Sequence, residues 1–333
     1  MLHSSLSCSG IQAGSRQGGS AQGQEGQESH QAGQAGSVGL VPDRQADGHR
    51  LWVPGESPGR LKSQPEREEV IMLNKLQQEA FDLIVNGHQN VLLTGNAGTG
   101  KSFTVNAVVK ALKDRGRNVQ VCASTALAAT AIGGKTMHSA MAIYPMWGKP
   151  GARKTLDQVI ADTTEMLSAR AAKQIRQYDV IIIDEVSMIH VVDLIRLDAQ
   201  LKKVRQNSEP FGGVQMVFVG DFLQLEPVHN AETCAVPLPQ GQSAFCFDSK
   251  KAWLPAGIQT IQLTEIVRQQ DVVFATFLNN VRCGIWHPWM SRIVEQRQGH
   301  EVPEGVPFFL PTNQEVDAIN EREMAKLPGE VVT

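Results

Sequence analysis

Eight consecutive residues constrain this chain more than any other feature. Residues 95–102 read Gly-Asn-Ala-Gly-Thr-Gly-Lys-Ser, which matches every fixed position of the phosphate-binding loop pattern. An apolar run at 91–94 precedes the octet, and a segment that can continue as a helix follows it. A strand, a glycine-rich loop and a helix in this order form the context that the pattern requires. The alternative is a glycine-rich turn that precedes a helix by chance.

Each part of the octet has an expected role in holding a nucleotide. The residues expected to turn backbone N–H groups inward around a β-phosphate are Gly95, Asn96, Ala97, Gly98, Thr99 and Gly100. We expect Lys101 to reach the β- and γ-phosphates and the Ser102 hydroxyl to ligate Mg²⁺. The octet therefore predicts a nucleotide-binding protein that uses Mg²⁺.

From residue 73 onward, short apolar segments alternate with helical patterns. This alternation is typical of an α/β fold with a mostly parallel sheet flanked by helices. Strands are expected at 91–94, 118–123, 180–183 and 214–219, and helices at 73–86, 101–115, 125–132, 155–177 and 268–283. The strand at 180–183 contains only valine and isoleucine, which indicates a central strand buried on both faces.

Two acidic residues stand where that central strand ends. Asp184 and Glu185 follow Ile183 directly. In nucleotide hydrolases the tip of a buried strand downstream of a phosphate loop holds Mg²⁺ and the attacking water. We expect Asp184 to hold Mg²⁺ and Glu185 to polarise the water. The alternative is an acidic strand end that faces solvent.

A glutamine follows the next expected strand. Residues 220–225 read Gly-Asp-Phe-Leu-Gln-Leu, and Gln224 in that place can bond both a γ-phosphate oxygen and the lytic water. The turn alone is equally compatible with an ordinary polar loop. Its position one strand after the acidic pair favours a sensor of the γ-phosphate.

The beginning of the chain differs in composition from the rest. The first sixty residues contain 12 of the 30 glycines, amid repeated glutamine, serine and alanine without a periodic apolar face. Such a segment buries too little apolar surface to offset its ordering entropy, so we predict a disordered extension at 1–71. It lacks the apolar core of a secretory signal. Met72 stands directly before the first structured pattern, and one hypothesis is that translation begins there.

Charge, hydropathy and cysteines narrow the class of protein. The net charge is −3 at pH 7, so contact with nucleic acid has to come from a local channel. No apolar run of membrane-spanning length is present, and no transmembrane helix is expected. The five cysteines form no Cys-x-x-Cys pair. We interpret them as reduced thiols without a zinc site, in an intracellular protein of the cytoplasm or nucleoid, or of a eukaryotic nucleus or mitochondrion.

Several motifs occur together in the order found in superfamily 1B helicases. They are Ala123-Ser124-Thr125, residues 133–139, Asp184 to Met188, Gly220 to Leu225, and Leu263 to Gln269. The chain resembles the PIF-type and RecD-like 5′→3′ DNA helicases over residues 73–327. Leu73-Asn74 with Gln77 is similar to the adenine-recognising glutamine motif of that family.

The resemblance implies an activity and a set of site residues. A member of this family hydrolyses ATP to translocate 5′→3′ on single-stranded DNA and to unwind duplexes. Gln77 would bond the adenine edge, and Arg268 would reach the γ-phosphate. The implied catalytic set is Lys101, Asp184, Glu185, Gln224 and Arg268. The implied contacts to the backbone of single-stranded DNA are Thr125, Thr136, His138 and Ser139.

The resemblance also predicts how the chain is divided and what it binds. Residues 72–300 would form a first RecA-like ATPase domain, with a short wedge-like insertion at about 229–245. Residues 301–333, with a strand at 307–310 and a helix at 313–327, would begin a second RecA-like domain whose later motifs are absent. We therefore expect an N-terminal motor portion with slow turnover. It would use ATP and Mg²⁺, bind single-stranded DNA and duplex junctions, avoid membranes and act as a monomer, in DNA replication, repair, recombination or telomere maintenance.

Other interpretations remain open at this point. A phosphate-loop kinase acting on a small molecule would need a lid with arginines, and it leaves residues 136–139 and 220–225 without a role. A truncated ATP-binding remnant or interaction module would explain the absent motifs. Single residues also have ordinary interpretations. These are His138 as a packed histidine, Arg268 as a solvated charge, and Phe245, Phe247 and Trp253 as core rather than a base-stacking platform.

Overall fold

The computed structural model describes residues 72–144, 153–229, 236–238, 243–269, 271–300 and 306–326. The extension expected at 1–71 lies outside the described residues, and so does most of the insertion expected at about 229–245.

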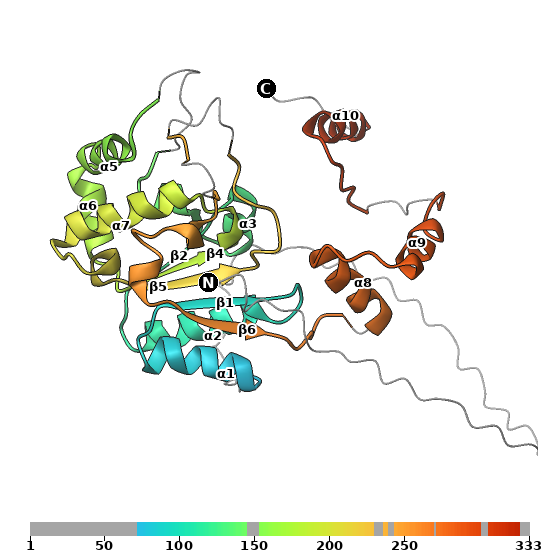
Figure 1. Cartoon of the computed structure of the whole chain (residues 1–333), viewed down its shortest axis with the longest axis horizontal. Helices are drawn as coiled ribbons and strands as arrows, with labels where there is room; N and C mark the ends of the chain where they lie inside the picture. The colour runs from blue at the N-terminus through green and yellow to red at the C-terminus, as the bar shows by residue number, and fades with distance from the viewer. Residues whose placement is uncertain are drawn as a thin grey trace, which may run out of the picture. The chain divides into compact units, whose positions relative to one another are not determined.

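Six strands form one sheet in the order β3-β2-β4-β5-β1-β6, and every neighbouring pair is parallel (Figure 1). The strands are β1 Val91–Gly95, β2 Val119–Ala123, β3 Lys135–Thr136, β4 Val180–Asp184, β5 Gln215–Gly220 and β6 Gln259–Leu263. β4 lies between β2 and β5, and its register pairs Ile182 with Val121 and Val217. The all-parallel sheet confirms the α/β prediction.

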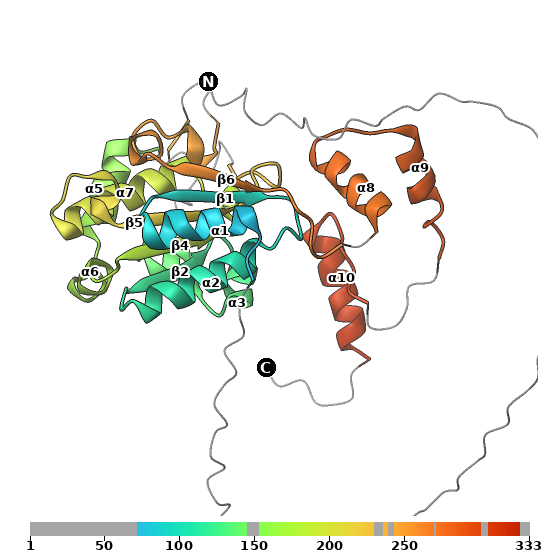
Figure 2. The same ribbon diagram turned by 90° about the horizontal axis from the view of Figure 1, so that it is seen from below.

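Helices cover both faces of this sheet (Figures 1 and 2). The helical elements are α1 Lys75–Phe81, η1 Asp82–Asn86, α2 Lys101–Asp114, α3 Ala126–Ala131, α4 Met137–Ala140, α5 Leu156–Glu165, α6 Ala169–Arg176, η2 Val186–Met188, α7 Val191–Arg205, η3 Pro210–Gly213, η4 Cys246–Asp248, η5 Leu254–Ala256, α8 Val272–Arg282, α9 Pro288–Glu295 and α10 Asn313–Met324. Alternate residues of β4 divide between two cores. Ile181 and Ile183 pack with α7, whereas Val180 and Ile182 pack with α1 and α2. Burial on both faces explains the uninterrupted apolar run.

Three expectations from the sequence need correction. The single helix expected at 155–177 is two helices, because Ser168 accepts a hydrogen bond from the Ala171 N–H and begins α6 there. Residues 306–310 form no strand, and the described part of the chain offers them no partner strand. β6 was missed, because only Ile261 and Leu263 of its five residues are buried at this sheet edge. The helix expected at 313–327 is confirmed as α10.

Candidate nucleotide and DNA site

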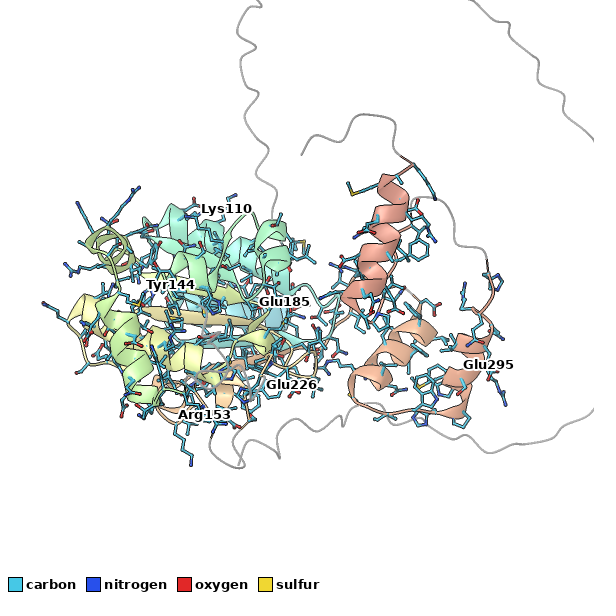
Figure 3. The ribbon with its side chains drawn as sticks, turned by 90° about the horizontal axis from the view of Figure 1, so that it is seen from above. Lys110, Tyr144, Arg153, Glu185, Glu226 and Glu295 are labelled. Carbon is cyan, nitrogen blue, oxygen red and sulfur yellow. The ribbon has the colours of Figure 1, made fainter. Side chains whose placement is uncertain are left out.

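The predicted chemistry gathers at one edge of the sheet, because parallel strands all end on the same side. β1 ends at Gly95, β4 at Asp184, β5 at Gly220 and β6 at Leu263. The phosphate loop, the acidic pair and the glutamine turn follow the first three of these ends, and Figure 3 labels Glu185 at this edge. Ligands of open α/β sheets bind beyond the carboxyl ends of the strands.

Glycines let the phosphate loop pass close to its neighbours. Gly98 and Gly100 have φ angles of 79° and 85°, in the left-handed region that side chains disfavour. A Cβ atom on Gly98 would lie 2.9 Å from the Cβ of Arg268, and one on Gly100 would lie 2.5 Å from Nε2 of Gln77. The loop is therefore enclosed by the glutamine of α1 on one side and by residues 267–268 on the other.

Lys101, the first residue of α2, closes the loop on itself. Its ammonium donates to the carbonyl oxygens of Gly95 at 2.7 Å and Asn96 at 3.1 Å. Burial lowers the pKa of Lys101, and the carboxylates of Asp221 and Glu185 oppose this effect. The ammonium thus lies between the loop and a group of carboxylates, within reach of a phosphate that enters the loop.

The acidic pair at the end of β4 has a strained backbone and shifted acidities. Glu185 has a φ of 53° and a ψ of 47°, a left-handed conformation that is uncommon outside glycine. Its N–H donates to Oδ1 of Asp184 at 2.9 Å. Burial raises the pKa of Asp184, and burial together with the negative charge of Asp184 raises the pKa of Glu185. A raised pKa suits Glu185 to accept a proton.

The side chain of Gln77 in α1 makes two hydrogen bonds with its neighbours. Gln77 is buried; its Oε1 accepts from the Asn74 N–H at 3.0 Å, and its Nε2 donates to the Thr99 oxygen at 3.3 Å. Asn74 in turn donates to a carboxylate oxygen of Glu265 at 2.9 Å. In this structure Gln77 therefore positions the phosphate loop, and one Oε1 lone pair and one Nε2 hydrogen remain for an adenine edge.

Three further side chains predicted for the site, the Mg²⁺ ligand Ser102 and the catalytic residues Gln224 and Arg268, are exposed. The backbone N–H of Arg268 donates to the Gly98 oxygen at 3.2 Å, which places this residue directly beside the loop.

Sequence reasoning missed the ion pair that supports the glutamine turn. Asp221 is 1% exposed and accepts from Nε of Arg282 at 2.5 Å and from Nη2 at 2.8 Å. Asp221 also accepts from the backbone N–H groups of Leu223 and Gln224. One turn earlier in α8, Asn279 accepts from the loop residue Asn96. Asp221 lies in the motif from Gly220 to Leu225, but no signal in the sequence indicated Arg282.

The residues matched to DNA contacts lie around α3 and α4. The side-chain oxygens of Thr125 and Thr136 accept from backbone N–H groups at the starts of these helices, so each hydroxyl hydrogen is left to donate elsewhere. His138 is half-buried, and its Nε2 lies 3.2 Å from Oδ2 of Asp193 in α7. Ser139 donates its N–H to Thr136.

A pair of histidines, His190 and His229, lies beside this group. His190 begins α7 by accepting the Val192 N–H at Nδ1, and its Nε2 lies 3.2 Å from Nδ1 of His229. The two rings stack with centroids 5.3 Å apart. Burial lowers the pKa of His190, the Asp193 carboxylate opposes this, and His229 adds to it.

This pair predicts a loss of stability on acidification. When the pKa of an imidazole is lower in the folded state than in the unfolded state, the unfolded state takes up the proton first as the pH falls. The group therefore leaves the unfolding free energy unchanged above about pH 6.5 and lowers it below that pH. We expect the unfolding free energy to drop more steeply between pH 7.5 and 5.5 in the wild type than in His190→Asn. The difference can reach about 1.4 kcal/mol per pH unit for one proton. Asparagine preserves the helix cap, and urea unfolding at each pH measures the effect; parallel slopes contradict it.

The aromatic residues near 245–253 form a core cluster. Phe222 meets Phe245, Phe247 and Trp253 edge-on, with centroids 4.8 to 6.0 Å apart. Phe247 packs against the main core and Trp253 belongs to it. The interpretation as core is therefore confirmed for Phe247 and Trp253, whereas Phe245 is half-buried and stacks on Phe247.

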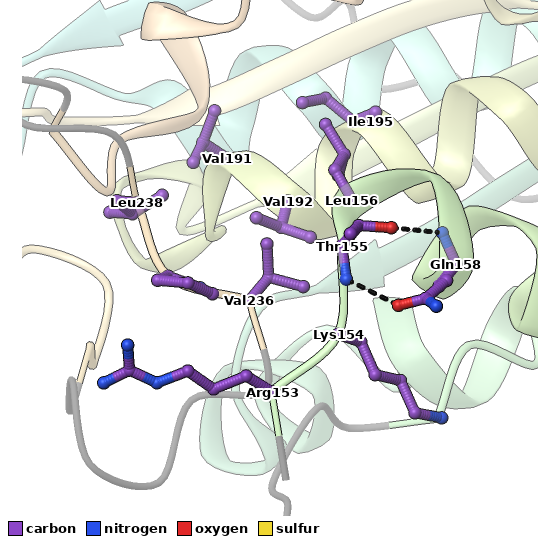
Figure 4. Close-up of a pocket in the computed structure, with 11 residues that line it drawn as sticks. Arg153, Lys154, Thr155, Leu156, Gln158, Val191, Val192, Ile195, Val236 and Leu238 are labelled. Atoms are coloured by element: carbon purple, nitrogen blue, oxygen red, sulfur yellow. Dashed lines mark hydrogen bonds between the residues drawn. The ribbon is translucent and has the colours of Figure 1, made fainter. Parts of the chain in front are cut away.

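Two of the cavities among the described residues differ in their linings. One of about 240 Å³ is bordered by Asn96, Asp221 and Gln224 and by residues of α8, so it belongs to the phosphate site. The larger, of about 400 Å³, lies between the starts of α5 and α7 and residues 236–238 (Figure 4). Its walls are mainly apolar, with Arg153 and Lys154 at one side, and no residue of the loop or acidic pair lines it. Size therefore does not identify the chemical site.

The fold and site define a RecA-like phosphate-loop nucleotide-binding domain. Within that class the chain belongs to the PIF1-like helicase family, whose family model matches residues 72–288. It is 37% identical over 270 residues to the ATP-dependent DNA helicase PIF1 of Saccharomyces cerevisiae, covering 78% of this chain and 29% of that protein. It is 33% identical over 266 residues to ATP-dependent DNA helicase PIF1 of Homo sapiens, covering 78% and 38%.

Solved structures agree with this assignment. The Pif1 helicase of Candida albicans superposes with a TM-score of 0.65 and 34% identity, over 78% of this chain and 56% of that one. A Bacteroides Pif1 helicase in complex with ADP-AlF3 and ssDNA gives a TM-score of 0.63 and 25% identity, over 78% and 58%. No helix in the described ranges is long and apolar enough to cross a bilayer.

Proposed function

We propose that this chain supplies the first motor domain of an ATP-dependent 5′→3′ DNA helicase. The observation that carries the proposal is the placement of the phosphate loop, the Asp184–Glu185 pair and the Gln224 turn at one edge of a parallel sheet. The chain spans about a third of the length of the curated relatives named above. Translocation and unwinding therefore belong to the proposal.

The proposed roles follow from the positions of the side chains. Lys101 exchanges its bonds to loop carbonyls for bonds to β- and γ-phosphate oxygens. Glu185 accepts a proton from the attacking water, and Gln224 orients that water against the γ-phosphate. Arg268, exposed beside Gly98, reaches the phosphates from the other side of the loop and stabilises the charge that develops there. Gln77 bonds the adenine edge in addition to holding Thr99.

The donor set fits Mg²⁺. Ser102 at the start of α2 and Asp184 at the end of β4 offer a hydroxyl and a carboxylate oxygen. Mg²⁺ prefers oxygen ligands and is held by one or two protein groups together with nucleotide phosphates. When bound, it neutralises charge on the phosphates.

We propose single-stranded DNA and duplex junctions as the partners. Thr125, Thr136, His138 and Ser139 form a polar group around α3 and α4 that can bond phosphate oxygens without reading bases. We propose a monomer as the binding unit. The thiols of Cys122 and Cys246, which are buried and form no disulfide, support an intracellular location. Residues 301–333 are proposed to begin a second RecA-like domain.

Hydrolysis of ATP by the full chain tests the proposal. We expect ATP binding with slow turnover that single-stranded DNA accelerates, because the DNA-facing and phosphate-facing residues share one sheet edge. The measurement is phosphate release with and without an oligothymidylate. Binding of ATP with no response to DNA would contradict the motor and favour an ATP-binding module.

A further inference from the structure

A network of buried hydrogen bonds supports the side chain of His138. Asp193 is 8% exposed in the first turn of α7, and its two carboxylate oxygens face different partners. Oδ2 lies 3.2 Å from Nε2 of His138, and Oδ1 accepts from Nη1 of Arg196 at 2.9 Å. Arg196 is 5% exposed and donates from Nε to the hydroxyl of Thr163 at 2.7 Å. Thr163 passes its own hydrogen to the Val159 oxygen.

The chemistry of these groups fixes the direction of every bond. A guanidinium only donates, so Asp193 must accept from Arg196. An ionised carboxylate also only accepts, so His138 must carry a hydrogen on Nε2. Burial tends to raise the pKa of Asp193, but the hydrogen bond from His138 and the charge of Arg196 outweigh it, and the net shift is downward. Asp193 is therefore an anion at neutral pH.

We propose that Asp193 fixes the tautomer of His138 so that the ring binds a DNA phosphate only by taking up a proton. With hydrogen on Nε2, the neutral ring has only a lone pair on Nδ1, its other polar atom. A phosphate oxygen accepts and does not donate, so Nδ1 contacts it only in the imidazolium form. Asp193 is a positioning residue in this scheme, which rests on the proposed contact of His138 with DNA.

Asp193 is the charged side chain that contacts the His138 ring. α4 itself carries no other titratable side chain. β3, which packs against it, contributes the exposed Lys135, and β2 contributes Cys122, whose thiol pKa burial raises to about 12. From α7, Asp193 also faces Arg196 and His190.

The first test reads the tautomer directly, without DNA. In ¹⁵N-histidine spectra of the full chain at pH 8, we expect the proton of His138 on Nε2. Asp193→Asn should move it to Nδ1. The Asn amide oxygen stays with Arg196, and its NH₂ group then faces the ring and needs a lone pair on Nε2. A wild-type ring with its proton on Nδ1 overturns the inference, whether or not the variant folds.

The second test measures the affinity for an oligothymidylate by fluorescence anisotropy at fixed ionic strength from pH 6 to 8.5. The wild-type Kd should fall with decreasing pH, by up to about tenfold per pH unit for one proton taken up. Asp193→Asn should flatten this dependence and bind at pH 8 at least as tightly as the wild type, since its neutral ring donates from Nδ1. His138→Gln should be flat and weaker.

Controls separate this inference from the proposed function. Asp157→Asn removes the same charge from an 88% exposed side chain and should keep the wild-type pH dependence. If Asp193→Asn weakens binding equally at every pH, Asp193 has only a structural role and the inference is overturned. If the tautomer is as expected but His138→Gln binds like the wild type, His138 does not contact DNA and proton uptake fails. DNA-stimulated hydrolysis in that variant would still support the motor.

Discussion

Lys101→Ala should lower the rate of ATP hydrolysis by about 10² to 10³-fold and weaken the binding of ATP. The Lys101 ammonium donates to two carbonyl oxygens of the loop and faces the carboxylates of Asp184, Glu185 and Asp221. Without it, those carboxylates repel the phosphates that the loop is shaped to receive. Mutations of single groups that stabilise charge in a dry site typically cost about 10² to 10³-fold in rate. Binding of ATP should also weaken, because we propose that Lys101 bonds the β- and γ-phosphates.

The matched control is Lys110→Ala. Lys110 lies on the same helix α2, is exposed (Figure 3), and loses the same charge. Phosphate release and fluorescent-nucleotide binding should be unchanged in this variant. Hydrolysis by Lys101→Ala at the wild-type rate would refute the assignment of the phosphate loop.

The parts of the fold that were predictable are those with local signals. The apolar run of β4 indicated a strand buried on both faces, and its two cores confirm this. The phosphate loop was predictable because its φ angles and close contacts exclude side chains, so the sequence has glycine at those positions. The edge strand β6 was missed because three of its five residues are exposed. The division between α5 and α6 was missed because its sequence signal is a single capping serine, which is weaker than the helical pattern on either side of it.

The supporting residues of the site were not predictable, for a physical reason. His138 and Asp193 are 55 residues apart in sequence, and Asp221 and Arg282 are 61 apart. A charged residue on a helix is ordinarily a solvated one, and only the tertiary fold shows that Asp193, Arg196 and Arg282 are nearly buried and paired. The residues proposed to contact ligands lie in local sequence motifs. The residues that support those side chains are identified only by their contacts with residues distant in the sequence.

Removing one side of the Asp221–Arg282 pair should destabilise the protein strongly and slow hydrolysis. Arg282→Met leaves the carboxylate of Asp221, which is 1% exposed, without its partner. Breaking a buried ion pair in this way costs about 3–5 kcal/mol. Asp221 also shapes the turn that carries Gln224. A misplacement of about 1 Å in such a group costs about 10²-fold in rate, so we expect a loss of that order in kcat.

A double-mutant cycle distinguishes this pair from two independent residues. Asp221→Asn with Arg282→Met removes the unpaired charge, so the double variant should lose less stability than the sum of the single variants. Urea unfolding measures the coupling, and Arg292→Met, which removes an exposed arginine from α9, controls for the change in net charge. Additive losses would contradict a buried pair. Because Asp221 holds the Gln224 turn while Asn279 and Arg282 bind the loop and the turn from α8, a coupled loss of kcat would show that α8 holds the two sides of the phosphate site in register.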